Sequence, residues 1–550
     1  MKKSNLFKVT AAAVAFILCL GIIASCGPAT TARPAAGGSA APSGYFNATG
    51  YPIVNEPITV NVLHSSGAQD GDRNELLFSK RMEELTGITM VYEAVDSTAW
   101  EETINLRFAS QEFPDFLWHS LNVIRETMYG VEGGMFYDLT GYIADYMPNI
   151  NKWFNQYPQD YNVLKAIDGK IYSLPYLIGT ATILGDTHYI RTDMMVKAGL
   201  TKKPSTVDEY FNTLTVMRDA GIDPEFIPLL MRPGTNPMST LEGFLFNAFG
   251  EATDPYLADD GSGKVIFNVV SDQYRLMLDF VRKLYEEKLL DQEFFTRTDN
   301  DAIAINLENL CGITNMGTLY TIANNFESGT YDVELFPPLV SEYTNNRKLR
   351  GYNQVSGIGN GAISVKCQYP EALARWMDIL YYLGDEEQIP GTGFYDQVGW
   401  LGFRGETWER FDDGTYKRLI PEGIDMSEVE YMSRFIIPGT GPMANVIWDI
   451  PVGSDSQRMK AMQSNEHLFP YLKPLFPISY LRYTESEMDV YSSRYTEIVD
   501  TYTKMMKAQF VTGELELNDA NWNNFVNEVN RMGLEDLLRA VQSSYDRMKG

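Results

Sequence analysis

Strands and helices alternate along the sequence, and this alternation limits the folds that the chain can adopt. Residues 58–63 read as a strand, residues 74–86 as a helix that stops at Gly87, and residues 88–92 as a second strand. This order forms a β-α-β unit, in which the helix returns the chain so that both strands run parallel. Further strands are expected at 114–118, 170–175, 187–191, 311–316 and 362–365. The alternation predicts an α/β fold with mostly parallel sheets.

The chain has 550 residues, which is more than one hydrophobic core usually organises, and this length suggests two large lobes. Hydrophobic residues make up 44% of the chain, which is enough to fill packed cores. Helices are expected at 192–198, 206–218, 273–288 and 370–383, and the helix at 206–218 is expected to be capped at Ser205. The chain from about Glu485 reads as almost wholly helical.

The net charge of -27 restricts the partners. An acidic surface repels phosphate backbones, so no nucleic-acid partner is expected. It also repels anionic lipids, so attachment to a membrane requires a separate device.

The N-terminus supplies such a device. Lys2, Lys3 and Lys8 precede an apolar stretch at 9–24, which is typical of a signal peptide over residues 1–25. Ile23-Ala24-Ser25-Cys26 resembles the bacterial lipobox, and this resemblance implies that Cys26 carries fatty acyl chains such as palmitate. The alternative is an ordinary signal peptide that Cys26 follows by chance. Residues 26–50 are rich in Ala, Gly, Ser, Thr and Pro and are expected to form a flexible tether.

Cysteine and histidine are too scarce for a disulfide framework or a zinc cluster. The globular part holds only Cys311 and Cys367, which could form one disulfide or remain two buried thiols. None of the four histidines lies four residues from another, so a histidine metal site is not expected. We expect neither a metal nor a cofactor.

Short segments along the globular part resemble the extracellular solute-binding lipoproteins of carbohydrate-type ABC importers, in the long variety related to the lipoprotein LplA. They follow one another in the order and spacing of that family from about residue 52 to 548. The segments include Glu84-Leu-Thr-Gly-Ile88, Ala109-Ser-Gln-Glu-Phe-Pro-Asp-Phe116, Asp168-Gly-Lys-Ile-Tyr-Ser-Leu-Pro175, Ile190-Arg-Thr-Asp193, Leu284-Tyr-Glu-Glu-Lys-Leu-Leu-Asp291, Tyr369-Pro-Glu-Ala-Leu-Ala-Arg-Trp-Met-Asp378 and Phe510-Val-Thr-Gly513.

The resemblance implies a two-lobed, periplasmic-binding-protein-like fold of type II, with a hinge and a ligand cleft. Residues 51–185 with about 316–368 are expected to form lobe 1, and residues 186–315 with about 369–550 to form lobe 2. It further implies a monomer, lipid-anchored on the extracellular side of the cell membrane, that delivers a sugar or oligosaccharide to a membrane permease. The acidic calcium loop of some relatives is not visible at Asp219-Ala-Gly-Ile-Asp-Pro224, and Gly391–Trp400 departs from the family pattern at a region that tends to face the ligand.

Sugar binding calls for aromatic faces and polar side chains, and α/β sheets present such groups at the carboxyl ends of strands. Reading the strand ends and the Gly- and Pro-flanked loops gives eight candidate ligand contacts: His64, Ser65, Trp118, His119, Tyr176, Tyr320, Trp400 and Trp448. For any single tryptophan, burial in a core is the commoner role. Trp100 and Trp376 are expected in cores, because both lie on apolar faces at helical spacing.

Catalysis has no positive support. Gly-x-Ser-x-Gly and His-Glu-x-x-His motifs are absent, so the chain is not expected to be an enzyme, although 72 acidic residues could include the two carboxylates of a glycoside hydrolase. An oligopeptide-binding receptor is the main alternative function. Gly357–Gly361 is expected to precede a strand, which argues against a phosphate-binding loop.

Overall fold

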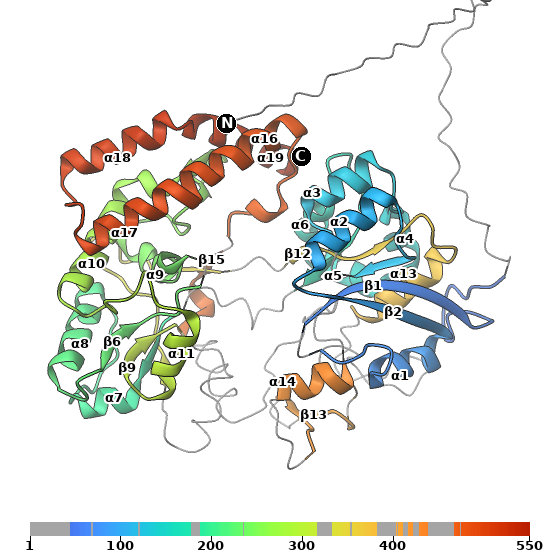
Figure 1. Ribbon diagram of the computed structural model, residues 1–550, viewed down its shortest axis with the longest axis horizontal. Helices are drawn as coiled ribbons and strands as arrows, with labels where there is room; N and C mark the ends of the chain where they lie inside the picture. The colour runs from blue at the N-terminus through green and yellow to red at the C-terminus, as the bar shows by residue number, and fades with distance from the viewer. Residues whose placement is uncertain are drawn as a thin grey trace, which may run out of the picture. The chain divides into compact units, whose positions relative to one another are not determined.

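The computed structural model (Figure 1) describes residues 44–67, 70–118, 121–177, 187–234, 236–315, 333–351, 355–381, 403, 405–410, 416–421, 428–437, 467–473 and 475–549. The chain from Gly38 to Gly550 forms one compact unit. Within it, two larger sheets each lie in a separate hydrophobic core. The predicted α/β class is confirmed.

The first sheet contains, in spatial order, β2 (Ile88–Asp96), β1 (Ile58–Ser66), β3 (Phe116–Trp118), β12 (Val355–Ile363) and β4 (Leu174–Leu177). β1 pairs in parallel with β2 and β3, whereas β12 runs antiparallel to β3 and β4. The second sheet contains β10 (Val333–Leu335), β5 (Tyr189–Arg191), β9 (Cys311–Thr314) and β6 (Ile227–Leu230). β6 pairs in parallel with β9, and β5 runs antiparallel to β9 and β10. One strand in each sheet, β12 in the first and β5 in the second, runs opposite to the others, so both sheets are mixed although most of their strands share one direction.

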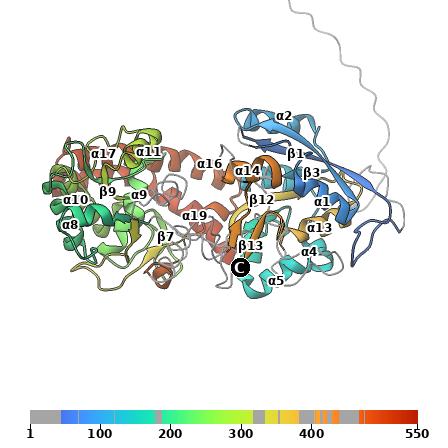
Figure 2. The ribbon, with the colours of Figure 1, turned by 90° about the horizontal axis from the view of Figure 1, so that it is seen from below.

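Helices cover both faces of the first sheet. Successive side chains of β1 point to opposite faces, and both faces carry apolar residues that must be buried. Val62 packs in the first core, which also holds Trp118 and Trp376, while Leu63 packs on the other face with Trp100. Figure 2 shows α2 and α13 on opposite sides of β1. The helices of this part are α1 (Leu77–Thr86), α2 (Trp100–Ser110), α3 (Val123–Arg125), α4 (Thr140–Tyr146), α5 (Pro148–Gln156), α6 (Pro158–Leu164), α13 (Pro370–Ile379) and α14 (Glu428–Tyr431).

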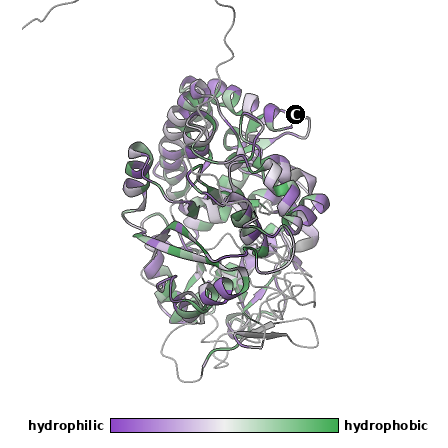
Figure 3. Ribbon diagram, turned by 90° about the vertical axis from the view of Figure 1, so that its right-hand side faces the viewer, coloured by the Kyte–Doolittle hydropathy of each residue, from purple (hydrophilic) through white to green (hydrophobic). Residues whose placement is uncertain are grey.

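The second core includes Tyr210, Leu284 and Val541 and joins the second sheet to the C-terminal helices. Hydrophilic and hydrophobic residues are interspersed along the helices, as expected for helices with one buried face (Figure 3). The expected helical C-terminus is confirmed. The helices are α7 (Thr192–Lys197), α8 (Val207–Asp219), α9 (Pro237–Leu245), α10 (Asp272–Glu286), α11 (Asp299–Leu307), α16 (Glu485–Tyr495), α17 (Lys504–Thr512), α18 (Asp519–Arg531) and α19 (Leu534–Lys549).

Three two-stranded ladders and several short turns complete the described elements. The ladders pair β7 (Leu257–Asp259) with β8 (Val265–Phe267), β11 (Leu349–Arg350) with β15 (Leu472–Lys473), and β13 (Trp408–Arg410) with β14 (Tyr416–Arg418). The 3₁₀ turns cover Phe246–Phe249, Asn268–Val270, Phe469–Tyr471 and Ile478–Tyr480, and the π turns cover Glu126–Glu132, Met432–Ile436 and Thr496–Thr503.

Two local predictions need correction. The cap of α8 is Thr206 rather than Ser205, because the Thr206 hydroxyl accepts a hydrogen bond from the Glu209 amide at 3.1 Å. The run Gly357–Gly361 lies inside β12 rather than before it. A Cβ at Gly361 would collide with Met377 and lie 3.0 Å from the Phe116 ring, so glycine allows the strand to pass close to the core.

The lobe boundaries remain a prediction. Two segments pack in the other core from the one that these boundaries imply. Trp376 of α13 lies in the first core, although residues 369–550 were expected in lobe 2. Leu335 and Leu349 lie in the second core, although residues 316–368 were expected in lobe 1. The chain re-enters the first core between Leu349 and Val355, a position that no local sequence pattern marks.

Two segments that link the cores are joined to each other. β11 pairs in parallel with β15, and the Tyr480 hydroxyl donates to the Val355 carbonyl. Tyr480 belongs to the first core and Leu481 to the second, so the chain crosses between them here. Next along the chain, the Arg482 guanidinium pairs with the Glu126 carboxylate at 2.8 Å, and both side chains are buried.

Cys311 and Cys367 are buried thiols in different clusters. The Cys311 thiol donates to Asn306 Oδ1 at 3.0 Å, and Cys367 packs in the first core, where burial raises the pKa of its thiol to about 12. Of the two alternatives, the structure has the pair of buried thiols.

Candidate ligand-binding site

Two of the predicted ligand contacts come together at the carboxyl edge of the first sheet. β1 and β3 are parallel, with Leu63 opposite Leu117, so His64 and Trp118 follow at neighbouring positions. Tyr92 of β2 joins them, with its ring 5.8 Å from each of the other two rings. The sheet register therefore produces an aromatic cluster at the edge where α/β proteins bind ligands.

His64 is a neutral, buried side chain. Its Nδ1 lies 2.9 Å from the Ser65 carbonyl oxygen, which fits an Nδ1–H donor and leaves Nε2 as the acceptor. Burial and the nearby Arg73 charge lower the pKa of His64 to about 4. In the part of the chain that the structure describes, His64 Nε2 has no hydrogen-bond partner. A hydroxyl donor is the group that would satisfy it.

Trp118 is fully buried, and protein groups surround its ring. The rings of Phe116, Tyr92 and Trp376 lie 5.9, 5.8 and 6.0 Å away. The Arg73 guanidinium lies 5.0 Å from the centre of the indole. Ligand contact by Trp118 stays a prediction, and the structure adds that its ring has no exposed face for stacking.

Arg73 completes this cluster and was missed in the sequence. It lies in the segment between β1 and α1 and is 2% exposed. Burial lowers the pKa of its guanidinium to about 10, opposed by Tyr92 and Asp70. The available signal was its place in the loop that follows the first strand, where a charged side chain can meet a ligand.

The other predicted contacts are more dispersed. Ser65 is partly buried, and its carbonyl orients His64. Tyr176 lies in β4 opposite Gly357 and is partly exposed. His119, Tyr320, Trp400 and Trp448, together with the lipidation candidate Cys26, lie outside the described residues.

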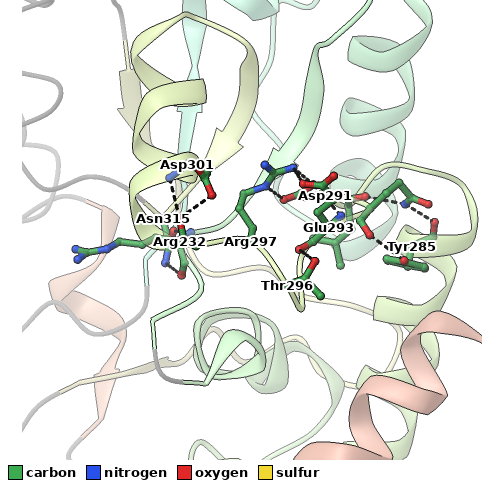
Figure 4. Close-up of polar contacts among 11 residues, drawn as sticks. Arg232, Tyr285, Asp291, Glu293, Thr296, Arg297, Asp301 and Asn315 are labelled. Atoms are coloured by element: carbon green, nitrogen blue, oxygen red, sulfur yellow. Dashed lines mark hydrogen bonds and ion pairs between the residues drawn. The ribbon is translucent and has the colours of Figure 1, made fainter.

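The second sheet has a carboxyl edge of its own, which Figure 4 shows around Arg232 and Asn315. Arg232 follows β6 and Asn315 follows the parallel strand β9, and the Arg232 amide donates to Asn315 Oδ1 at 2.7 Å. Asp299, the first residue of α11, holds Arg232 Nε at 2.9 Å and the Gly234 amide at 2.8 Å. The carboxylate thus fixes the loop and the direction of the guanidinium.

Arg232 was missed because the strand before it was missed. Ile227–Leu230 is short, contains Pro228 and gives a weak strand signal. The Arg232 side chain is 45% exposed, unlike the buried side chains at the first edge. It is therefore accessible to a ligand as the structure stands.

Buried charged side chains stabilise the loop at this second edge. Asn236 donates to the Tyr256 hydroxyl at 2.8 Å, and Tyr256 donates to the buried Glu242 carboxylate. Glu242 pairs with Lys507 of α17 at 2.9 Å. Burial lowers the pKa of Lys507, which the Glu242 carboxylate opposes. The C-terminal helices therefore hold the loop between β6 and α9 in place.

Across the described ranges, no group of three or more His, Cys, Asp or Glu side chains is arranged to hold a metal ion. Within those same ranges no helix has the length and apolar character needed to cross a bilayer.

The comparisons with known proteins agree with one another. Residues 74–384, more than half of the chain, match the family model described as bacterial extracellular solute-binding protein. The fructooligosaccharide ABC transporter substrate-binding protein FusA of Streptococcus pneumoniae serotype 4 (strain ATCC BAA-334 / TIGR4) is 24% identical and is matched over 97% of both chains. Lipoprotein LipO of Bacillus subtilis (strain 168) is 26% identical over 39% of this chain and 41% of its own.

Structural similarity extends over nearly the same length. The structure of the S. pneumoniae protein FusA in complex with kestose matches with a TM-score of 0.65 and 23% identity, and covers 90% of this chain and 99% of that one. This shows a shared two-lobed fold. The chain belongs to the bacterial extracellular solute-binding proteins.

Proposed function

We propose that this chain is the substrate-binding component of an ABC importer and captures an oligosaccharide. The observation that carries the proposal is the match to FusA, which covers 97% of both chains. The two proteins therefore share the whole binding body rather than one domain. The polar side chains at the second sheet edge, above all the accessible Arg232, fit the hydroxyls of a sugar.

The mechanism we propose is closure of two lobes on the ligand. Lobe 1 would contain the first core and present the His64 edge, and lobe 2 would contain the second core and present the Arg232 edge. A ligand that contacts both edges stabilises the closed form, because only that form makes both sets of contacts. The permease would then recognise the closed form.

Attachment to the membrane through acylated Cys26 is part of the proposal. The similarity to the lipoprotein LipO supports it. Two or more acyl chains would hold the protein at the extracellular surface, at about 0.8 kcal/mol per buried CH₂ group. We further propose that the protein acts as a monomer and leaves its ligand chemically unchanged.

Calorimetric titration of residues 38–550 with neutral and acidic oligosaccharides, including kestose, tests this function. We expect at least one to bind with a Kd of about 1 µM or below. The bound sugar should be recovered intact after prolonged incubation. Binding of peptides without binding of any sugar would favour an oligopeptide receptor, and steady release of reducing sugar would favour a hydrolase.

A further inference from the structure

A pocket of about 260 Å³ lies where a link between the two cores meets the C-terminal helix. One part of the lining is formed by Asn162 and Val163 in the last turn of α6 and by the residues just after this helix, Lys165, Ala166, Ile167 and Gly169. Ser544, Arg547 and Lys549 of α19 form another part, and Arg482 lies between the two. The pocket is separate from both sheet edges.

The lining is basic in an acidic protein. Lys165, Arg482, Arg547 and Lys549 line the pocket, and no Asp or Glu is among its lining residues. This reverses the balance of the whole chain, which has 45 basic and 72 acidic residues. The carboxylates that pair with three of these cations, Glu126, Glu487 and Asp259, all contact them from outside the lining.

Arg482 and Ser544 make the pocket rigid, because both are buried. The Arg482 guanidinium is fixed by Glu126 and by the Tyr480 carbonyl at 2.6 Å. The Arg482 carbonyl in turn accepts hydrogen bonds from Ser544 Oγ and Arg547 Nη2, each at 2.8 Å. The basic groups are therefore positioned before any ligand arrives.

Two side chains have donors to offer. The Lys165 ammonium donates to Asn162 Oδ1 at 3.0 Å, and an ammonium carries three N–H donors. Arg547 uses Nη1 and Nη2 on Glu487 and Nη2 also on the Arg482 carbonyl, and its guanidinium has a further N–H donor at Nε. The nearby Asp168 carboxylate accepts from Tyr172 at 2.7 Å and pairs with Lys170 at 3.2 Å, and it is not part of the lining.

We propose that this pocket binds a small oxyanion, a phosphate or carboxylate group on a molecule below drug size. Charge-assisted hydrogen bonds from Lys165 and Arg547 hold it, and Arg482, held in place by Glu126, forms the wall between them. The volume is just under the range of pockets for drug-sized ligands. Lys165 follows α6, which packs in the first core, and Arg547 lies on α19, which packs in the second, so a bound anion contacts parts of both.

The test titrates residues 38–550 with inorganic phosphate, and in a second arm with citrate, at constant ionic strength in a calorimeter. The variant Lys165→Gln/Arg547→Gln removes the two donors. The matched control Lys152→Gln/Arg539→Gln removes the same charges from exposed positions on α5 and α19. We expect wild type and control to bind at least one anion, and the pocket variant to bind it about tenfold or more weakly.

Two results overturn the proposal: no binding of either anion by the wild type with a Kd below about 10 mM, or equal affinity in the two double variants. If Arg547→Gln disturbs folding, as judged by circular dichroism, Lys165→Gln alone decides. Lys165 is exposed, and this single change should still weaken binding severalfold. Glycan binding in the cleft is measured separately, so the two proposals can fail independently.

Discussion

The carboxyl edges of the two sheets have similar positions but opposite exposure. At the first edge, His64 is 1% exposed, Arg73 2% and Trp118 0%. At the second edge, the side chains of Arg232 and Asp299 are 45% and 34% exposed. The first edge therefore contributes packing energy to its core, whereas the second edge adds little packing and leaves its donors accessible. Substitutions should separate these roles, with the larger effects on folding at the first edge and effects mainly on binding at the second.

The largest expected effect is that of Trp118→Ala. Removing an indole packed among three rings leaves a cavity, and we expect the free energy of unfolding to fall by about 3–5 kcal/mol. Urea denaturation followed by circular dichroism measures it. The control Tyr343→Ala, at a side chain that is 47% exposed, should change stability little. A loss below about 1 kcal/mol for Trp118→Ala would show that the first edge is not part of the packed core.

An intermediate effect is expected from pH at the first edge. The folded-state pKa of His64 is about 4, below the unfolded value of about 6.5, so the unfolded state binds a proton first as the pH falls. The stability linked to His64 is fully present above pH 6.5 and is lost as the pH falls toward 4. We expect a loss of about 2 kcal/mol between pH 8 and pH 5.

The variant His64→Gln should remove this part of the acid sensitivity, measured as urea midpoints across the pH range. His188 is its counterpart in the second core, stacked 4.1 Å from Phe244, and burial lowers the pKa of His188 to about 3. The variant His188→Gln should remove a separate part. An unchanged pH dependence in His64→Gln would contradict the proposed neutral state.

The smallest effect on stability is expected from Arg232→Ala. An exposed ion pair contributes about 0–1 kcal/mol, so the urea midpoint should hardly move. The affinity for the oligosaccharide should fall about tenfold, because two charge-assisted hydrogen bonds are lost. The matched control Arg531→Ala removes an exposed ion pair from α18 and should leave affinity unchanged. Equal affinity in the two variants would remove the second edge from the binding site.

Much of the fold followed from local pattern. The β1-α1-β2 unit and the α10 helix were predicted within a few residues, because hydrophobic periodicity is a local property. The direction of β12 and the place of α13 in the first core were not predictable in this way. Both depend on where the chain crosses between cores.

The candidate site was predictable to a smaller extent. The sequence placed His64 and Trp118 at strand ends, and the parallel register brought them together. It did not indicate that Trp118 would be covered, since coverage comes from Trp376, which lies more than 250 residues later along the chain. Arg73 and Arg232 were missed because a lone arginine in a loop has no periodic signal.

The linked segments between the cores have a mechanical consequence. The β11–β15 ladder joins them near the second core, and the bond from Tyr480 to Val355 joins them near the first. Two linking segments that are hydrogen-bonded to each other near both cores cannot easily slide past one another. Their backbones can still bend together. Opening and closing should then be a rotation about one hinge axis rather than independent motion of two flexibly linked lobes. The substitution Tyr480→Phe removes the hydrogen bond to Val355 and should make the hinge motion less constrained.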